Sequence, residues 1–124
     1  MKFQPDSIDV QSISGYGPGW IGIGTEKITT STVLGSRGER FDWACDQFDD
    51  LSELHFAQLA ALGTELIIFG SGNRIRFPRP AWLAPLVQRQ IGIETMDVHA
   101  ACRTYNILAG EGRHVAVALL MASP

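Results

Sequence analysis

The apolar run at residues 65–69 constrains the fold of this chain more than any other feature. Its sequence is ELIIF, in which Glu65 is followed only by large apolar side chains. A strand with one wet face alternates apolar and polar residues, whereas a strand covered on both faces is apolar throughout, as in α/β proteins. We therefore predict that this run is a central strand of an α/β core.

The pattern downstream of the run alternates between helix and strand. Leu83, Leu86 and Val87 have helical spacing, and Pro85 is tolerated if that helix begins near Trp82, because first-turn amides have no internal partner. The remaining segments predict a strand at 91–95, a helix at 97–109 and a last strand at 114–121.

A helix is also predicted just before the apolar run. Asp50-Leu51-Ser52-Glu53 has capping-box spacing with Asp50 as the cap, and Phe56, Leu59 and Ala60 share one helical face. We expect this helix to run to about Leu62 and to stop at Gly63.

The first 44 residues are β-like and rich in turns. Apolar alternations lie near residues 10–16, 20–24, 27–34 and 39–44, and glycines separate them. A literal G-x-G-x-x-G occurs at Gly17, Gly19 and Gly22. In dinucleotide-binding folds a helix leaves this turn, but residues 23–30 are rich in glycine and β-branched side chains. We predict a hairpin or meander here and no nucleotide site.

The composition is that of one soluble domain, residues 1–124. Hydrophobic residues make up 45% and charged residues 19%, and no apolar run is long enough to span a bilayer. The first ten residues lack the basic region and apolar core of a signal peptide. We expect a cytoplasmic protein with no membrane insertion, in which Cys45 and Cys102 are free thiols.

Charge is unevenly distributed along the chain. The net charge of −3 argues against nucleic-acid binding, even though arginines and aromatics mix between Arg74 and Trp82. An acidic stretch spans residues 42–53, whereas window 66–93 has no acid and contains Arg74, Arg76, Arg79 and Arg89. These are two solvated surfaces or a polarised partner surface, since complementary charge orients an encounter. Arg74, Arg76 and Arg79 are the candidate partner surface.

Gly70-Ser71-Gly72 directly follows the predicted central strand. Open α/β sheets bind ligands at this edge, but residues 73–78 do not open a helix that could cradle a phosphate. Either the glycines allow a tight backbone path, or they leave a small crevice beside a ligand or partner.

The helix at 97–109 has two distinct faces. Its apolar arc consists of Val98, Ala101, Cys102, Tyr105, Leu108 and Ala109, and a polar arc beside it carries His99, Arg103 and Asn106. A buried thiol is inert, so we do not favour a Cys102–His99 nucleophile pair. The histidines show no metal-ligand spacing, and we predict no catalytic residues, metal or cofactor.

Four polar residues flank the end of this helix: Arg103, Asn106, Glu111 and Arg113. Glu111 and Arg113 would form a structural clamp if the carboxylate held the arginine against the open helix carbonyls. Arg103 and Asn106 would instead face a crevice. We favour the clamp for the first pair and the crevice for the second.

The segment GIETMDVHAACRTYNILAGEGRHVAVALL, residues 92–120, closely resembles the C-terminal signature of a widespread family of unknown function. That family includes the mitochondrial respiratory complex I assembly factor numbered three. Gly70-Ser71-Gly72 is similar to its glycine pair, and Ile13, Gly15, Tyr16 and Trp43 are similar to its N-terminal pattern. Val98 and Gly110 depart from it, because threonine and alanine are usual there.

The resemblance implies a three-layer α/β fold with a central mixed sheet, helices on one side and an additional N-terminal β layer. It implies no reaction. We expect a non-catalytic accessory protein that binds another protein, in complex I assembly or biogenesis. The alternative is a small-ligand protein or enzyme whose crevice is formed by Gly70, Ser71, Gly72, Arg103, Asn106, Glu111 and Arg113. The oligomeric state is left open.

Overall fold

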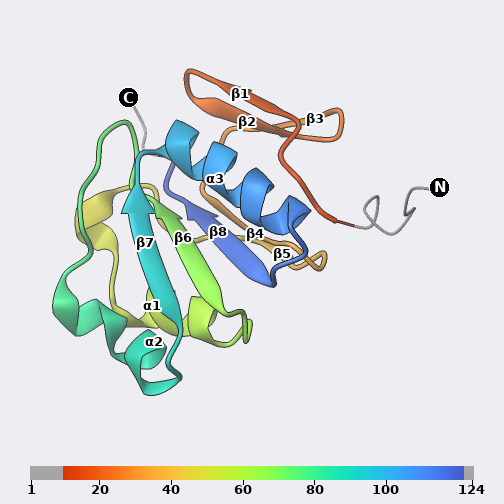
Figure 1. Ribbon diagram of the computed structural model, residues 1–124. Coiled ribbons are helices and arrows are strands. Elements are labelled where there is room, and N and C mark those ends of the chain that lie inside the picture. Colours follow the sequence, from red (N-terminus) through yellow and green to blue (C-terminus); the bar gives the residue numbers. More distant parts are fainter. Residues whose placement is uncertain (1–9, 122–124) are drawn as a thin grey trace.

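The computed structural model describes residues 10–121, which form a five-stranded mixed sheet and a smaller three-stranded antiparallel sheet (Figure 1). The small sheet has the order β1-β2-β3 and the large one β5-β4-β8-β6-β7. The strands are β1 Gly15–Gly17, β2 Trp20–Ile23, β3 Glu26–Ile28, β4 Thr32–Gly35, β5 Arg40–Asp42, β6 Leu66–Gly70, β7 Gly92–Met96 and β8 Val115–Leu119. The helices are α1 Glu53–Ala60, α2 Ala84–Gln88 and α3 Val98–Gly110, with 3-10 turns η2 Phe48–Asp50 and η3 Pro80–Leu83.

The large sheet is built from two halves joined by β8. Strands β6 and β7 are parallel to each other, and β8 is parallel to β6, whereas β4 is antiparallel to both β5 and β8. All five residues of β8 are buried. The apolar run at 65–69 forms an interior strand as predicted, but the middle strand is β8.

Each face of the large sheet has its own core. On one face Val33, Ile67 and Phe69 pack with Trp43 and with side chains of α1, α2 and η3. On the other face Ile68 and Val117 pack with α3 and with the N-terminal strands. The α/β fold with a mixed sheet and an added N-terminal β layer is thus confirmed. The helices, however, lie on both faces, since α3 shares a face with the small sheet.

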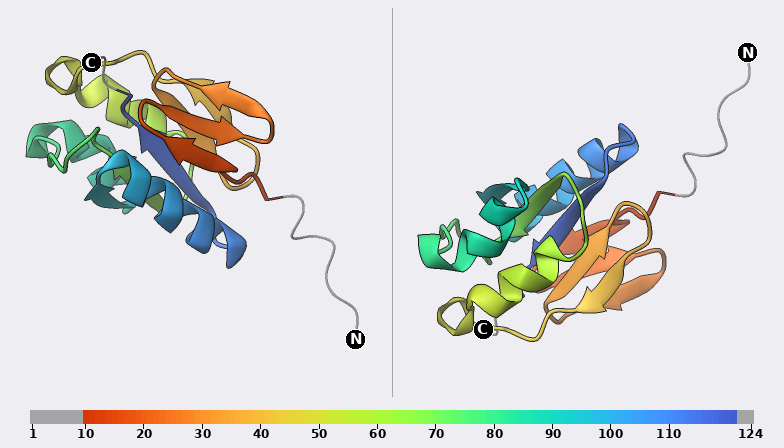
Figure 2. Two further views of the ribbon diagram at one scale, coloured as in Figure 1. Left: turned by 90° about the horizontal axis from the view of Figure 1, so that it is seen from above. Right: turned by 90° about the horizontal axis from the view of Figure 1, so that it is seen from below.

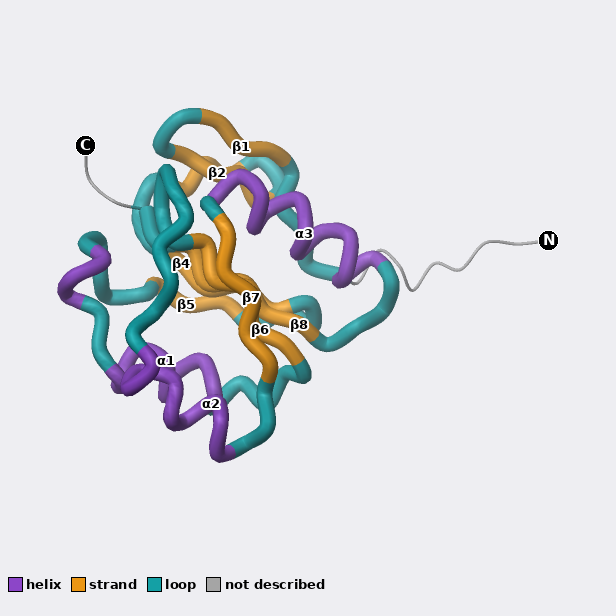
Figure 3. The backbone as a smooth tube through the Cα atoms, turned by 60° about the vertical axis from the view of Figure 1, so that its left-hand side comes forward, coloured by secondary structure: helices purple, strands orange, loops and turns teal. Residues whose placement is uncertain are grey.

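The views from above and from below show where the N-terminal layer lies relative to α2. In Figure 2 the N-terminal strands lie at one end of the molecule and α2 at the other. Figure 3 shows the loop after β6 running from one end of the sheet down to α1 and α2. Most of this loop therefore lies on the side of the sheet that α1 and α2 cover.

Two boundaries differ from the sequence prediction. The cap of α1 is Ser52, not Asp50, because Ser52 is extended and its N–H donates to His55 Nδ1 at 3.1 Å while Asp50 lies in η2. The alternation at 27–34 spans two strands of different sheets, β3 and β4, since Thr29–Ser31 carries the chain from one sheet to the other. The G-x-G-x-x-G segment is the β1–β2 hairpin, as predicted.

Candidate functional site

The polar arc of α3 binds the N-terminal strands. Asn106 Oδ1 accepts a hydrogen bond from the backbone N–H of Ile13 at 2.8 Å, and its Nδ2 donates to the Ile13 carbonyl at 2.8 Å. Arg103 Nη1 donates to the Tyr16 hydroxyl at 2.9 Å, and His99 Nε2 lies 3.0 Å from the Gly17 carbonyl oxygen. The side chains that the sequence assigns to a crevice are therefore used to fasten the chain's own N-terminal layer.

The end of α3 contains no Glu111–Arg113 clamp. Arg113 Nε donates to Glu65 Oε1 at 2.7 Å, on the loop before β6, while Glu111 is exposed and makes no ion pair with any residue of 10–121. The clamp prediction is wrong because the Arg113 guanidinium pairs with Glu65 instead, and the chain between Glu111 and Arg113 passes through Gly112 with a φ of +86°. Glu65 and Arg113 are 48 residues apart in sequence, and they meet because β6 and β8, which follow them, are paired side by side.

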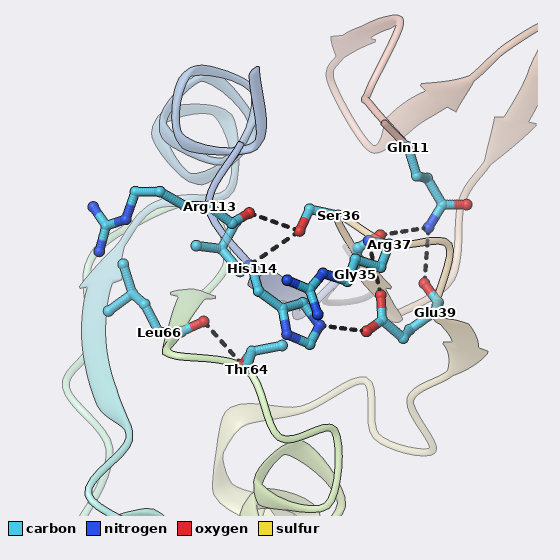
Figure 4. A network of polar contacts seen from close by, with 10 residues as sticks. Gln11, Gly35, Ser36, Arg37, Glu39, Thr64, Leu66, Arg113 and His114 are labelled. Carbon is cyan, nitrogen blue, oxygen red and sulfur yellow. Dashed lines mark hydrogen bonds and ion pairs between the residues drawn. The ribbon is translucent and has the colours of Figure 1, made fainter. Parts of the chain in front are cut away.

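A second polar network lies near Arg113, where the turn between β4 and β5 meets the start of β8 (Figure 4). His114 Nε2 donates to Glu39 Oε2 at 2.7 Å, and Gln11 Nε2 donates to the carbonyls of Gly35 and Glu39 at 3.0 and 2.8 Å. Burial opposes ionisation of Glu39, but hydrogen bonds from His114 and from backbone N–H groups lower the pKa of its carboxyl. A hollow of about 330 Å³ beside this network is lined by Val10, Ser36, Arg37, Ala109, Gly112 and Arg113.

Gly70 is a packing glycine. A Cβ there would lie 2.9 Å from Leu119 Cδ2, 3.1 Å from Ala101 Cβ and 3.2 Å from Val98 Cα. The first turn of α3 thus packs directly on the end of β6, which favours the tight-path interpretation at this position. Gly72 has a φ of +113°, and its carbonyl accepts the first N–H of α3, from Val98, at 2.9 Å.

Ser71 organises the β6–η3 loop, residues 71–79. It is 4% exposed, its Oγ donates to the Arg74 carbonyl at 2.7 Å, and the same oxygen accepts the Arg76 N–H at 2.8 Å. Its backbone N–H donates to the carbonyl of Met96 at the end of β7. One buried hydroxyl therefore fixes the conformation of the loop from within.

Two arginines fasten the outer part of the loop to η2 and η3. The Arg76 guanidinium lies 4.1 Å from the ring centroid of Phe48, and its Nη2 is 3.3 Å from Asp49 Oδ1. Arg79 lies over Trp82 and 3.8 Å from the same Asp49 oxygen. The acidic and basic stretches of the sequence thus meet at Asp49.

Two large apolar side chains on this loop were not among the predicted site residues. Ile75 is 52% and Phe77 73% exposed, and they alternate with Arg74 and Arg76. Alternation with arginines at the surface was the signal that could have identified them. Beside them lies a hollow of about 240 Å³, lined by Gln47, Phe48, Ser71, Gly72, Asn73, Arg74, Arg76 and Leu120.

The predicted site residues thus lie in three different places. The β6–η3 loop contains Ser71, Gly72, Arg74 and Arg76. Arg103 and Asn106 lie where α3 contacts the N-terminal layer, and Arg113 lies just after the end of α3. Cys102 is fully buried, and burial raises the pKa of its thiol to about 12. Within residues 10–121 no three metal-ligating side chains gather, and no helix has the length and apolar character to cross a bilayer.

Comparisons with known proteins identify relatives in sequence and in structure. The bovine (Bos taurus) NADH dehydrogenase [ubiquinone] 1 alpha subcomplex assembly factor 3 is 32% identical over 80 residues, which are 63% of this chain and 44% of the bovine protein. The chain therefore spans less than half the length of that relative. A crystal structure from Bordetella parapertussis aligns with a TM-score of 0.84 and 33% identity, over 90% of this chain and 95% of the other.

A solution structure from Bordetella pertussis, described as a Mth938-like domain, aligns with a TM-score of 0.82 and 28% identity over 97% of this chain and 92% of the other. The family model for proteins of unknown function DUF498/DUF598 matches residues 13–120. This match begins at Ile13, whose backbone Asn106 binds, ends one residue after β8 and so includes both sheets. The chain belongs to the DUF498/DUF598 family.

Proposed function

We propose that this chain is a non-catalytic accessory protein that works by binding another protein, in the assembly or biogenesis of respiratory complex I. The relatives named as complex I assembly factors support the biological setting through a shared segment of 80 residues. The proposal includes no cofactor, no nucleic acid and a cytoplasmic location. Its partner surface is the β6–η3 loop with Arg74, Arg76 and Arg79.

The observation that carries the proposal is the exposure of Ile75 and Phe77 on a loop that is otherwise held rigid. Large apolar side chains are usually exposed singly, and a pair presented by a fixed backbone is typical of a binding surface. Ser71 and Asp49 fix the loop from the inside and the outside. A partner would bury the two side chains without the entropic cost of ordering the loop.

Site-directed photo-cross-linking tests this proposal. A photoreactive phenylalanine analogue replaces Phe77 in the full chain, and a matched variant carries it at Ile107, which is 61% exposed on α3. After irradiation in native lysate, we expect a discrete adduct from position 77 only. Mass spectrometry should identify the captured protein as a complex I subunit or assembly component. Identical adducts from both positions, or none from position 77, would contradict the proposal.

A second candidate function is the binding of a small carboxylate or phosphate. The hollow of about 240 Å³ beside Gly72 favours it, because Arg74 and Arg76 both line that hollow. Calorimetric titration with inorganic phosphate and with citrate tests it on the wild type and on Arg74→Ala. Saturable heat in the wild type that is lost in the variant would support an anion site, and no heat in either would exclude these two anions.

A further inference from the structure

The β6–η3 loop also indicates the chemistry of the partner, an inference that rests on the proposed function. We infer that the partner presents a short segment in which an acidic side chain lies next to large apolar ones. The acidic group would pair with Arg74, and the apolar groups would cover Ile75 and Phe77.

Arg74 is the arginine of the loop that is left for a partner. Arg76 and Arg79 both contact Asp49 and each lies over an aromatic ring. Arg74 is exposed, and none of the acidic side chains within residues 10–121 forms an ion pair with it. Its carbonyl accepts the Ser71 hydroxyl at 2.7 Å, so the loop holds the backbone of Arg74 in place.

The apolar part of the surface lies directly beside this cation. Ile75 and Phe77 are exposed, whereas Arg76 between them packs on Phe48 and Pro78 after them is buried. The loop thus presents a cation and two apolar side chains within four consecutive residues. A segment with a carboxylate near aromatic or aliphatic groups matches this order in charge and in polarity.

A polypeptide fits this surface better than an anionic bilayer does. Asp49 lies beside Arg76 and Arg79, and its side chain is 70% exposed. The neighbouring Asp50 is exposed as well. A uniformly anionic lipid surface would approach these carboxylates together with Arg74 and would be repelled. A narrow segment can direct its carboxylate to Arg74, which makes no ion pair within residues 10–121.

The test is a selection of phage-displayed random peptides against the immobilised full chain, followed by titration of labelled synthetic peptides. We expect the selected peptides to be enriched in Asp or Glu next to Phe, Trp or Leu. Arg74→Glu and Phe77→Ser should each weaken binding by about tenfold or more, as for other buried interface anchors. The matched controls, Arg37→Glu and Ile107→Ser, change an exposed arginine and an exposed apolar residue elsewhere and should leave binding unchanged.

A charge exchange makes the assignment specific. A peptide whose acidic residue is replaced by lysine should bind Arg74→Glu better than it binds the wild type. Peptides without an acidic bias, no peptide that depends on the loop, or failure of the charge exchange would each overturn the inference. Loop-dependent binding to phosphatidylglycerol vesicles, absent with phosphatidylcholine vesicles, would overturn it in favour of a membrane surface.

Failure of this inference is distinguishable from failure of the proposed function. If the cross-link from position 77 captures a partner whose contact segment is basic or uncharged, the chemistry assigned here is wrong and the accessory role stands. If the cross-link captures nothing, the accessory role itself is contradicted.

Discussion

The side chain of Asn106 forms hydrogen bonds with both backbone groups of Ile13, as a neighbouring β-strand would. Its carboxamide satisfies both the N–H and the carbonyl of Ile13, each at 2.8 Å, although the two residues are 93 positions apart. Ile13 itself is buried, so neither backbone group has ready access to water if the carboxamide is removed.

Asn106→Ala should therefore destabilise the protein by about 2 kcal/mol, because it leaves two partly buried backbone groups without a partner. Arg103→Ala and Glu111→Ala should each change the free energy of unfolding by no more than about 0.5 kcal/mol, since both side chains are exposed. Urea unfolding followed by tryptophan fluorescence measures all three. Asn106→Asp, which keeps an acceptor for the Ile13 N–H but no donor for its carbonyl, should fall between Asn106→Ala and the wild type. Equal losses in Asn106→Ala and Arg103→Ala would contradict this account.

Gly70 and Gly110 offer a matched pair of glycine substitutions. Gly70→Ala should destabilise the fold by about 1 to 3 kcal/mol, because the new methyl group meets Leu119, Ala101 and the backbone of Val98. Gly110 lies at the end of α3 with nothing within 4 Å of an added Cβ and no positive φ. Gly110→Ala should therefore be neutral or stabilise by up to about 1 kcal/mol. Thermal melts of the two variants check the contrast, which would fail if both lost stability.

The two cysteines should differ in their rates of reaction with a thiol reagent. Burial raises the pKa of the Cys102 thiol to about 12, so almost no thiolate is present at pH 8 and the sulfur is covered. In a Cys45→Ser background, labelling should be slow in buffer and fast in denaturant. The pKa of Cys45 is also raised, by burial first and by the nearby Asp50 and Asp46, so it should react more slowly than a fully exposed thiol. Fast native labelling of Cys102 would refute its place in the core.

Stability should fall in acid in a way that depends on Glu39. The folded pKa of Glu39 lies below its ordinary value of 4.5, so its carboxylate stabilises the folded state above about pH 4.5. This contribution is lost as the pH falls through the lower, folded pKa. Glu26 and Glu65, whose pKa values are lowered by hydrogen bonds from Arg40 and Arg113, act in the same direction.

Urea titrations at several pH values from 6 to 3 measure how much Glu39 contributes to the pH dependence of the free energy of unfolding. Glu39→Gln should lose less stability over this range than the wild type, whereas Glu94→Gln, an exposed carboxylate on β7, should follow the wild-type curve. Parallel curves for the wild type and Glu39→Gln would show that the Glu39 carboxylate contributes nothing to the pH dependence.

Local patterns predicted local structure, and pairings between distant segments were where prediction failed. The helix expected at 97–109 is α3, Val98–Gly110, because Asp97 caps it through Ala100 N–H and its apolar arc is continuous. The same periodicity marked His99, Arg103 and Asn106 as one polar arc. Nothing in it indicates that this arc would meet Ile13 and Tyr16, since that contact depends on how the N-terminal layer folds back.

The partner of Arg113 shows the same limit. Glu111 is two residues away in sequence, yet Glu65, 48 residues away, holds the guanidinium. Proximity in sequence is a weak guide at a turn, because a glycine with positive φ lets the backbone take a path that neighbouring positions do not reveal. The order of strands is also set by packing, so the apolar run predicted an interior strand but could not show that β8 would insert beside it.

The position of β8 has a consequence for synthesis of the protein. Strands β4 and β6 are not paired with each other, and each is paired with β8, residues 115–119. The large sheet can therefore be completed only after β8, its last strand in the sequence, has been made. A chain emerging from the ribosome from its N-terminus must hold the edges of both halves unpaired until residue 119 has left the exit tunnel. Unpaired edges attract other strands. Any stop that removes residues 115–119 would therefore leave two half-sheets without the strand that joins them, each with an edge open to pairing with other chains.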